Sequence, residues 1–272
     1  MSLHDNICIY KDLATLCKIS YNISQTTEYE FDKSEAEIFK YLSQKITHIE
    51  TKYLNPNPNV LSILSNDSNT LYIVISGSDD VCDFTSDLNI IQKTPKFGKI
   101  KDIKFHNGFL NRAYMIFDNI LIHIEQFIKN GGSEIYLTGH SSGGSIVSIL
   151  AYYLHTHNIF NYNNLHVVTF GSPLFVNSIG AKWFNDNIQY HRIELFKDPV
   201  PNLSMFIDYE HISKNYILIK KSNMYINTRR SKKISFLHFI KKIFVNVENL
   251  HYHLTSTYLE KLSKIKYIYT KN

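Results

Sequence analysis

The sequence predicts an α/β fold with a mostly parallel central sheet flanked by helices. Short apolar runs alternate along the chain with longer stretches whose apolar residues recur at helical spacing. This alternation favours parallel strands joined by right-handed crossovers. Residues 71–76 (LYIVIS) form an apolar run, as expected of a central strand that is covered on both faces. The 272 residues are expected to form a single domain, residues 1–272.

The elements are expected in the following places. Helices are predicted where apolar residues recur at helical spacing, at residues 11–24, 33–46, 111–128, 145–154 and 255–265. Strands are predicted at the apolar runs 60–64, 71–76, 134–138, 165–170, 190–196 and 215–220, the last of them at an edge of the sheet. Gly131 and Gly132 end the long helix that precedes the strand at 134–138.

Composition excludes several classes of protein. The net charge of +5 and the sequence pI of about 8.8 are too mild to predict nucleic-acid binding. The three cysteines (Cys8, Cys17 and Cys82) have neither a disulfide framework nor the spacing of metal ligands, which favours free thiols in a reducing compartment. The first residues, MSLHDNICIYKD, lack a basic start followed by an apolar stretch. We therefore expect an intracellular protein, with secretion left open if a signal has been removed.

Residues 139–144 (GHSSGG) carry the strongest chemical signal of the chain. They fit the pattern G-x-S-x-G with Ser141 at its centre, between a predicted strand and a predicted helix. In that context the pattern predicts a nucleophile elbow, a tight turn in which side chains at Gly139 and Gly143 would clash. The alternative is a structural Gly/Ser turn. The elbow predicts that Ser141 is a nucleophile.

A serine nucleophile needs a base, usually His, and a carboxylate that orients the base. Both are sought downstream of Ser141. Asp198 follows a predicted strand in a loop stiffened by Pro199 and Pro201, which makes it the first candidate, with Asp208 second. The candidates for the base are His211, His238, His251 and His253. The last two stand just before the predicted C-terminal helix, a sensible place for a general base.

An oxyanion hole needs two hydrogen-bond donors. Ser78 follows the predicted strand 71–76 and would donate both its backbone N–H and its hydroxyl. The second donor would be the backbone N–H of Ser142, the residue after the nucleophile.

Several segments together resemble one family. They occur in order at residues 13–21, residues 75–78 (ISGS) with Asp83-Phe84 and Asp87-Leu88, residues 106–109 (HNGF), 139–144, 169–173 (TFGSP) and 198–201 (DPVP). This combination is similar to the class 3 lipases, the α/β-hydrolase group that includes the fungal triacylglycerol lipases. The resemblance spans roughly residues 8–262 and implies an α/β-hydrolase fold and hydrolysis of carboxylic esters of lipids.

The resemblance also selects a base. A common ending in the family is His followed five residues later by Tyr, and His253 with Tyr258 fits this spacing whereas His251 does not. The resemblance thus implies a triad of Ser141, Asp198 and His253, with His251 as the second choice and His211 as a supporting residue.

The sequence departs from the family at the oxyanion strand. Ser76 and Ser78 stand where the family usually has the Arg and Thr of R-G-T, and Phe84 stands where the lid segment usually has Trp. Ser78 keeps a hydroxyl donor. The change at Phe84 and the acidic pair at Asp79 and Asp80 put lid behaviour and interfacial activation in doubt.

No cofactor or metal is implied. His155 and His157 are two residues apart on a predicted helix, so they face different ways and favour a helix end over a zinc pair. The aspartates at positions 79, 80, 83 and 87 lack the calcium-loop pattern of an EF-hand.

Residues 229–244, from Arg229 to Phe244, are basic and carry apolar residues at helical spacing. They would either pack as a core-facing helix with a solvated basic back, or lie on an anionic membrane or lipid-droplet surface. The sequence does not specify the oligomeric state.

The sequence therefore predicts a serine hydrolase that cleaves lipid esters of the triacylglycerol lipase or carboxylesterase type. Alternatives are a phospholipase A1-type activity, or a catalytically weak lipase-like protein that binds lipids or partners. A nucleic-acid-binding module lacks any recognised signature in this chain.

Overall fold

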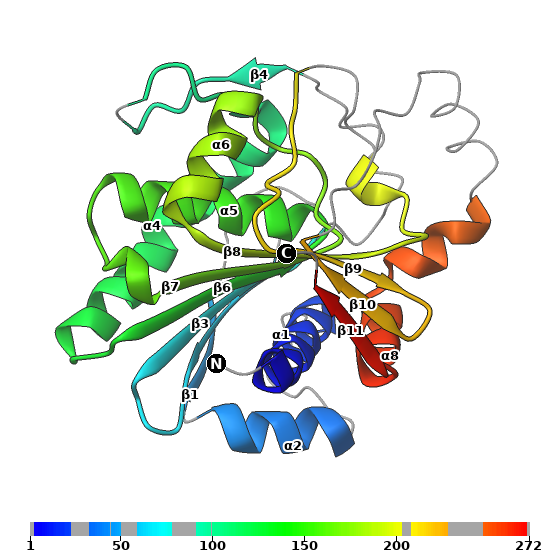
Figure 1. Cartoon of the computed structure of the whole chain (residues 1–272). Helices are drawn as coiled ribbons and strands as arrows, with labels where there is room; N and C mark the ends of the chain where they lie inside the picture. Colours follow the sequence, from blue (N-terminus) through cyan, green and yellow to red (C-terminus); the bar gives the residue numbers. More distant parts are fainter. Residues whose placement is uncertain are drawn as a thin grey trace.

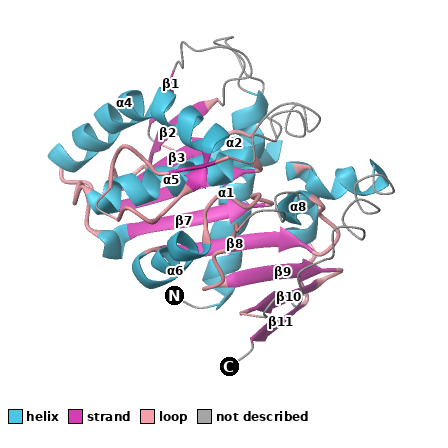
Figure 2. Ribbon diagram, turned by 90° about the horizontal axis from the view of Figure 1, so that it is seen from above, coloured by secondary structure: helices cyan, strands magenta, loops and turns pink. Residues whose placement is uncertain are grey.

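The computed structural model describes residues 3–22, 33–43, 45–49, 59–77, 91–98, 100–202, 208–227 and 247–270. Its centre is a nine-stranded sheet with the strand order β1-β2-β3-β6-β7-β8-β9-β10-β11 (Figures 1 and 2). The strands are β1 (Lys45–Ile49), β2 (Val60–Leu64), β3 (Thr70–Ile75), β6 (Glu134–His140), β7 (Leu165–Phe170), β8 (Gln189–Leu195), β9 (Tyr216–Lys220), β10 (Asn223–Ile226) and β11 (Tyr267–Thr270). A separate antiparallel pair joins β4 (Gln92–Lys93) and β5 (Phe105–His106).

The centre of the sheet is parallel. β3, β6, β7, β8 and β9 pair in parallel with one another in that order, and β10 pairs in parallel with β11. The antiparallel pairs are β1 with β2, β2 with β3, and β9 with β10. The predicted α/β fold with a mostly parallel sheet is confirmed. The carboxyl ends of the central strands consequently meet at one edge of the sheet.

Helices cover both faces of the sheet (Figure 1). On one face lie α1 (Leu3–Asn22), α2 (Lys33–Leu42) and α8 (Thr255–Ser263), and on the other lie α4 (Asn107–Lys129), α5 (Ser142–Thr156) and α6 (Ser178–Asn187). Three short 3-10 helices are η1 (Tyr162–Asn164), η2 (Val200–Asn202) and η3 (Val247–His253). Within the described residues, no helix is both long and apolar enough to cross a bilayer.

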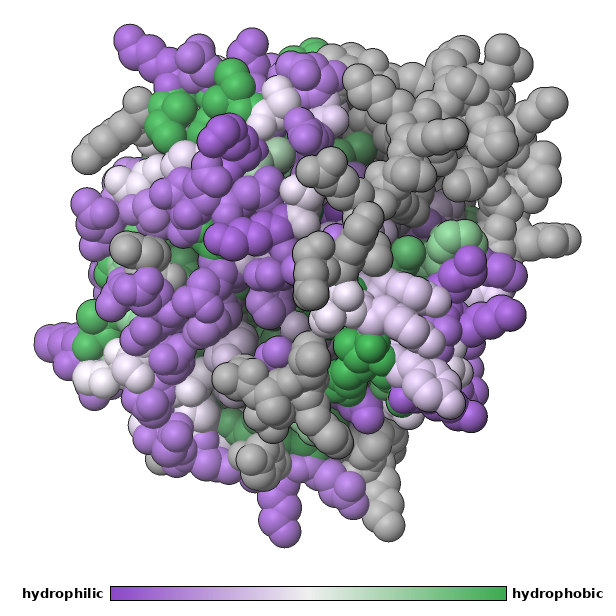
Figure 3. Space-filling view, in the orientation of Figure 1, coloured by the Kyte–Doolittle hydropathy of each residue, from purple (hydrophilic) through white to green (hydrophobic). Residues whose placement is uncertain are grey.

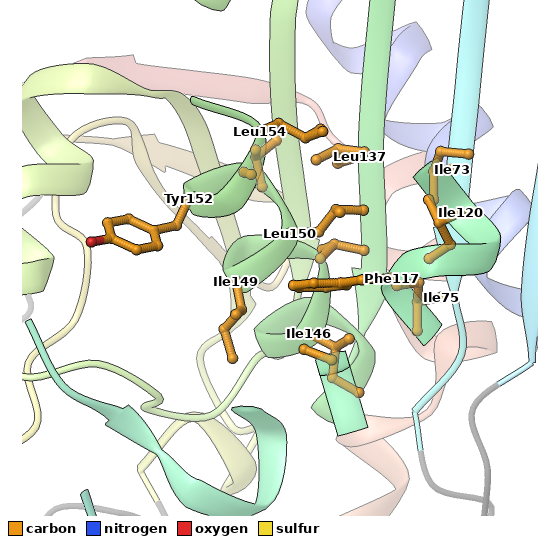
Figure 4. Close-up of a cluster of buried hydrophobic side chains, with 14 of the residues drawn as sticks. Ile73, Ile75, Phe117, Ile120, Leu137, Ile146, Ile149, Leu150, Tyr152 and Leu154 are labelled. Carbon is orange, nitrogen blue, oxygen red and sulfur yellow. The ribbon is translucent and has the colours of Figure 1, made fainter. Parts of the chain in front are cut away.

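Each face of the sheet has its own hydrophobic core. α4 presents buried residues three or four positions apart to the sheet, and α5 is buried along almost its whole length. Both helices pack over β3 and β6, where Phe117, Leu150 and Leu137 belong to one cluster (Figure 4). On the described part of the face seen in Figure 3, hydrophobic residues form small patches among hydrophilic ones. The apolar residues that recur at helical spacing in the sequence therefore lie mainly in the interior.

The structure corrects three of the expected elements. The helix expected at residues 33–46 ends at Leu42, and Lys45 begins β1 because residues 45–49 pair with β2. The strand expected at 215–220 is β9, which lies between β8 and β10 and is not an edge strand. The C-terminal helix ends at Ser263, and β11 follows it. In all three places the deciding contacts are pairings with other strands.

Candidate active site

Ser141 stands in the turn between β6 and α5. Its backbone has φ 56° and ψ −133°, a region that a residue with a side chain enters only under constraint from its surroundings. The constraint is close packing. A Cβ atom at Gly139 would lie 2.5 Å from the carbonyl carbon of Gly143, and one at Gly143 would lie 2.2 Å from the carbonyl oxygen of Ile75. The predicted clash at Gly139 and Gly143 is confirmed, and the turn has the shape of a nucleophile elbow.

Asp198 and His253 meet although 55 residues separate them. Asp198 lies in the turn after β8, and His253 ends η3. His253 Nδ1 lies 3.0 Å from Asp198 Oδ2 and 3.1 Å from Oδ1. Both residues are buried, with relative exposures of 1% for Asp198 and 2% for His253. An ionised carboxylate only accepts hydrogen bonds, so Nδ1 carries the proton and the lone pair of the imidazole is on Nε2.

Two further donors hold the Asp198 carboxylate. The Tyr258 hydroxyl donates to Oδ2 at 2.6 Å, and the backbone N–H of Val200 donates to Oδ1 at 2.9 Å. Burial, followed by the neighbouring charge of Asp198, raises the pKa of Tyr258 well above its usual value, so Tyr258 stays a donor. In the sequence, Tyr258 was significant only for its spacing of five residues from His253. The structure shows that it orients the carboxylate.

His253 Nε2 is available as a proton acceptor. It is buried and makes no hydrogen bond to any residue in the described part of the chain, Ser141 included. The ring of His140, the residue before Ser141, lies against the ring of His253 with centroids 4.5 Å apart. Ser141 and His253 thus lie near each other without a hydrogen bond between them, as is common in unliganded active sites.

The other candidates lie as follows. Asp208 is exposed. His251 is exposed, and its ring is tilted by 42° against the ring of Tyr252, with centroids 4.0 Å apart. His211 Nε2 lies 2.8 Å from the carbonyl oxygen of Pro201, so it supports the loop after Asp198. The structure therefore brings His253, and not His251, to Asp198.

Of the two predicted oxyanion donors, the structure describes Ser142 and not Ser78. Ser142 is the first residue of α5 and is buried at 1% exposure, so its backbone N–H lies at the positive end of the helix dipole. Ser78 lies outside the described residues, which reach Gly77 on this loop. His238 and the acidic positions 79, 80, 83 and 87 also lie outside them.

The features predicted not to bind metal have ordinary partners. His155 lies edge-on to Trp183 with centroids 5.0 Å apart, and His157 Nδ1 lies 3.0 Å from the carbonyl oxygen of Tyr153. Within the described ranges, no three His, Cys, Asp or Glu side chains are grouped to hold a metal ion.

This fold and elbow define an α/β-hydrolase, and the comparison with known families agrees. The model of the family described as lipase (class 3) matches residues 72–207, which is half of the chain. The chain belongs to this family.

Relatives and solved structures are consistent with that membership. The chain is 28% identical to a lipase of Rhizomucor miehei over 138 residues, covering 49% of this chain and 37% of the relative. It is 27% identical to the secreted mono- and diacylglycerol lipase 1 of Fusarium solani over 151 residues, covering 54% of this chain and 44% of the relative. The matched part therefore spans less than half of each relative. The crystal structure of the Lip2 lipase from Yarrowia lipolytica superposes with a TM-score of 0.72 at 18% identity, covering 92% of this chain and 94% of that one.

Proposed function

We propose that this protein is a serine hydrolase that cleaves carboxylic esters of lipids through an acyl-enzyme intermediate. The observation that carries the proposal is the buried His253–Asp198 pair beside Ser141, whose backbone is strained at an elbow. Membership of the class 3 lipase family supports the ester as the substrate class. The nine-stranded sheet, to which residues from both ends of the chain contribute, supports a single domain.

In the proposed mechanism Ser141 Oγ attacks the acyl carbon while His253 Nε2 takes its proton. The Asp198 carboxylate stabilises the imidazolium that forms at His253. The backbone N–H of Ser142, together with Ser78, would stabilise the tetrahedral oxyanion. His253 then protonates the leaving alcohol, and water releases the acyl group by the same steps. Each step uses side chains or backbone of this chain, so the proposal includes no cofactor.

The test is turnover of a panel of esters, from triacylglycerol and diacylglycerol to phospholipid and a short-chain p-nitrophenyl ester. Products are identified by mass spectrometry. We expect hydrolysis of acylglycerols by the wild type and loss of about 10⁶ in kcat in Ser141→Ala. Faster release of the first acyl chain of a phospholipid would instead identify a phospholipase A1-type enzyme. Binding of lipid without a burst of p-nitrophenol would identify a catalytically weak lipid-binding protein.

We further propose that residues 229–244 contact an anionic lipid surface. These residues lie outside the described part of the chain, and the support is their sequence, in which Lys232, Lys233, Lys241 and Lys242 accompany an apolar stripe. Each such charge is worth about 1 kcal/mol near an anionic leaflet. Replacing the four lysines with Gln is expected to weaken binding to anionic vesicles and to spare hydrolysis of a soluble ester. Equal vesicle binding at low salt would support a core-packed helix instead.

We also propose that the protein works inside the cell. Cys17, which is buried, is a free thiol, which suits a reducing compartment. Recovery of the expressed protein from the culture medium, and not from the cell lysate, would contradict this placement.

A further inference from the structure

Tyr21 at the end of α1 connects two parts of the candidate site. Its hydroxyl oxygen accepts the backbone N–H of Gly77 at 2.9 Å and lies 2.7 Å from His140 Nδ1. The direction of the second bond depends on the tautomer of His140: with Nδ1 unprotonated, the Tyr21 O–H donates to it while the oxygen accepts the Gly77 N–H. One hydroxyl thus joins the end of β3 to the residue that precedes the nucleophile.

Gly77 is held tightly at this place. A Cβ atom at Gly77 would lie 2.3 Å from the Tyr21 hydroxyl and 2.8 Å from the Cβ atom of Ser141. The backbone that leads into Ser78, the predicted oxyanion donor, therefore passes directly beside the nucleophile. Its N–H has the Tyr21 hydroxyl as acceptor, so the position of this backbone depends on Tyr21.

His140 contacts the predicted base. Its ring is buried at 4% exposure and lies 4.5 Å from the ring of His253, centroid to centroid. Burial, and then the nearby His253, lower the pKa of His140 well below its usual value, so the ring is neutral. With Nδ1 accepting from Tyr21, the proton of His140 is on Nε2. A neutral, fixed ring at this place lets His253 take up a proton beside it without charge repulsion.

We propose that Tyr21 is a positioning residue of the active site: its hydroxyl holds the backbone of Gly77, the residue before the predicted oxyanion donor, and holds His140 in one tautomer against His253. The proposal rests on the proposed ester hydrolysis. Tyr21 touches neither substrate nor reacting atoms, and it acts through Gly77 and His140.

The same helix contains a matched control. The Tyr10 hydroxyl lies 2.6 Å from His191 Nδ1 in a bond of the same kind. The two pairs have similar ring geometry, with centroids 5.7 Å apart and interplanar angles of 61° for Tyr10–His191 and 67° for Tyr21–His140. Eleven residues are about three helical turns, so both tyrosines are on one face of α1. His191 lies near the start of β8, whereas the candidate site is at the other end of the strands.

The experiment compares Tyr21→Phe with Tyr10→Phe and the wild type by steady-state kinetics on p-nitrophenyl butyrate. We expect Tyr21→Phe to lower kcat about 10-fold, less than the loss of a direct oxyanion donor, with KM unchanged. Tyr10→Phe is expected to keep the wild-type kcat. The thermal unfolding temperature should fall in both variants, and at least as much in Tyr21→Phe, because each loses a hydroxyl bonded to a histidine and Tyr21→Phe also loses the acceptor of the Gly77 N–H. Equal kcat values in the two variants would overturn the proposal.

The tautomer of His140 can be measured on the wild type, independently of whether Tyr21→Phe folds. Nitrogen-15 NMR of the histidine rings between pH 5 and 8 should show His140 neutral with its proton on Nε2. A proton on Nδ1 of His140 would overturn the proposal. A wild type without ester turnover would remove the proposed function and this role together, whereas turnover with unchanged kcat in Tyr21→Phe would remove the role of Tyr21 alone.

Discussion

Two histidine–carboxylate pairs lie at opposite ends of the same sheet. At the amino ends of β6 and β7, His166 Nε2 lies 2.7 Å from Glu134 Oε2, and the side chains are 23% and 34% exposed. Past the carboxyl ends of the strands, His253 Nδ1 lies 3.0 Å from Asp198 Oδ2, and the side chains are 3% and 0% exposed. The shorter contact belongs to the more exposed pair, which is itself partly buried, so distance alone does not distinguish an active site.

Burial and additional partners make the difference. Asp198 also receives the Tyr258 hydroxyl and the Val200 N–H, so its carboxylate is fixed from three sides. His166 stacks on Tyr136, and its contact with Glu134 is only partly buried, so water screens it. The buried pair has a strained serine beside it, and the exposed pair does not. An open α/β sheet places its functional sites at the carboxyl ends of its strands, and this molecule conforms to that rule.

The largest expected effect separates the two histidines. His253→Ala removes the proposed base and should cost about as much as loss of the nucleophile, about 10⁶ in kcat. His166→Ala should leave kcat unchanged because that ring faces solvent at the far end of the sheet. Labelling by a fluorophosphonate probe measures both. His251→Ala is a second control, and if it abolished labelling while His253→Ala did not, the base would be His251.

Substitutions of the two carboxylates should differ less in their effect on kcat than substitutions of the two histidines. Asp198→Asn keeps the size of the side chain but no longer stabilises the imidazolium, and in a comparable triad this change costs about 10⁴ in kcat. Glu134→Gln is the matched change at the exposed pair and should have no measurable effect. Steady-state kinetics on a soluble ester provide the comparison. Similar losses in the two variants would mean that the buried pair has no special role.

The oxyanion donor comes next. Ser78→Ala should lower kcat by about 10²–10³ with little change in KM, the usual cost of removing one donor. Ser78→Thr keeps the hydroxyl and should retain activity. An unchanged kcat in Ser78→Ala would restrict Ser78 to a role through its backbone N–H.

The smallest effect concerns stability and sharpens the comparison at the amino end of the sheet. Burial, and then His166, lower the pKa of His191 to about 4. In the unfolded chain His191 is protonated below about pH 6.5, whereas in the folded chain it stays neutral until the pH approaches 4. The contribution of His191 to stability is therefore complete above pH 6.5 and falls as the pH drops toward 4. Between pH 7.5 and 5 the loss from His191 is about 2 kcal/mol. Urea unfolding at the two pH values measures it.

His191→Gln is the control for this pH dependence. The amide can still accept the Tyr10 hydroxyl, but it does not titrate, so the loss between pH 7.5 and 5 should shrink by about the contribution of His191. An identical loss in His191→Gln would show that other groups cause it.

Local patterns predicted much of the fold and part of the site. The elbow at Ser141 follows from backbone sterics, because Gly139 and Gly143 have no room for a side chain. The central strands follow from their apolar runs, which only a sheet covered on both faces buries. Asp198 was found because it follows such a strand, and the structure places it beside His253.

Contacts between distant residues were not predictable in the same way. The sequence alone left several histidines open, and their choice depended on a resemblance until η3 was seen to place His253 beside Asp198. β11 completes the sheet by pairing in parallel with β10, more than 40 residues earlier in the chain, and its short sequence does not predict this pairing. The Tyr21 hydroxyl meets Gly77 and His140 across gaps of 56 and 119 residues.

The sequence by itself therefore determined the class of fold, the strained serine and the carboxylate, because periodicity and steric exclusion act between near neighbours in the chain. Tertiary structure decided how His253 meets Asp198, how far the sheet extends beyond β9, and which of two similar tyrosine–histidine pairs adjoins the site. Those outcomes depend on how α1, η3 and α8 pack against the sheet, and packing joins residues whose spacing along the chain carries no signal.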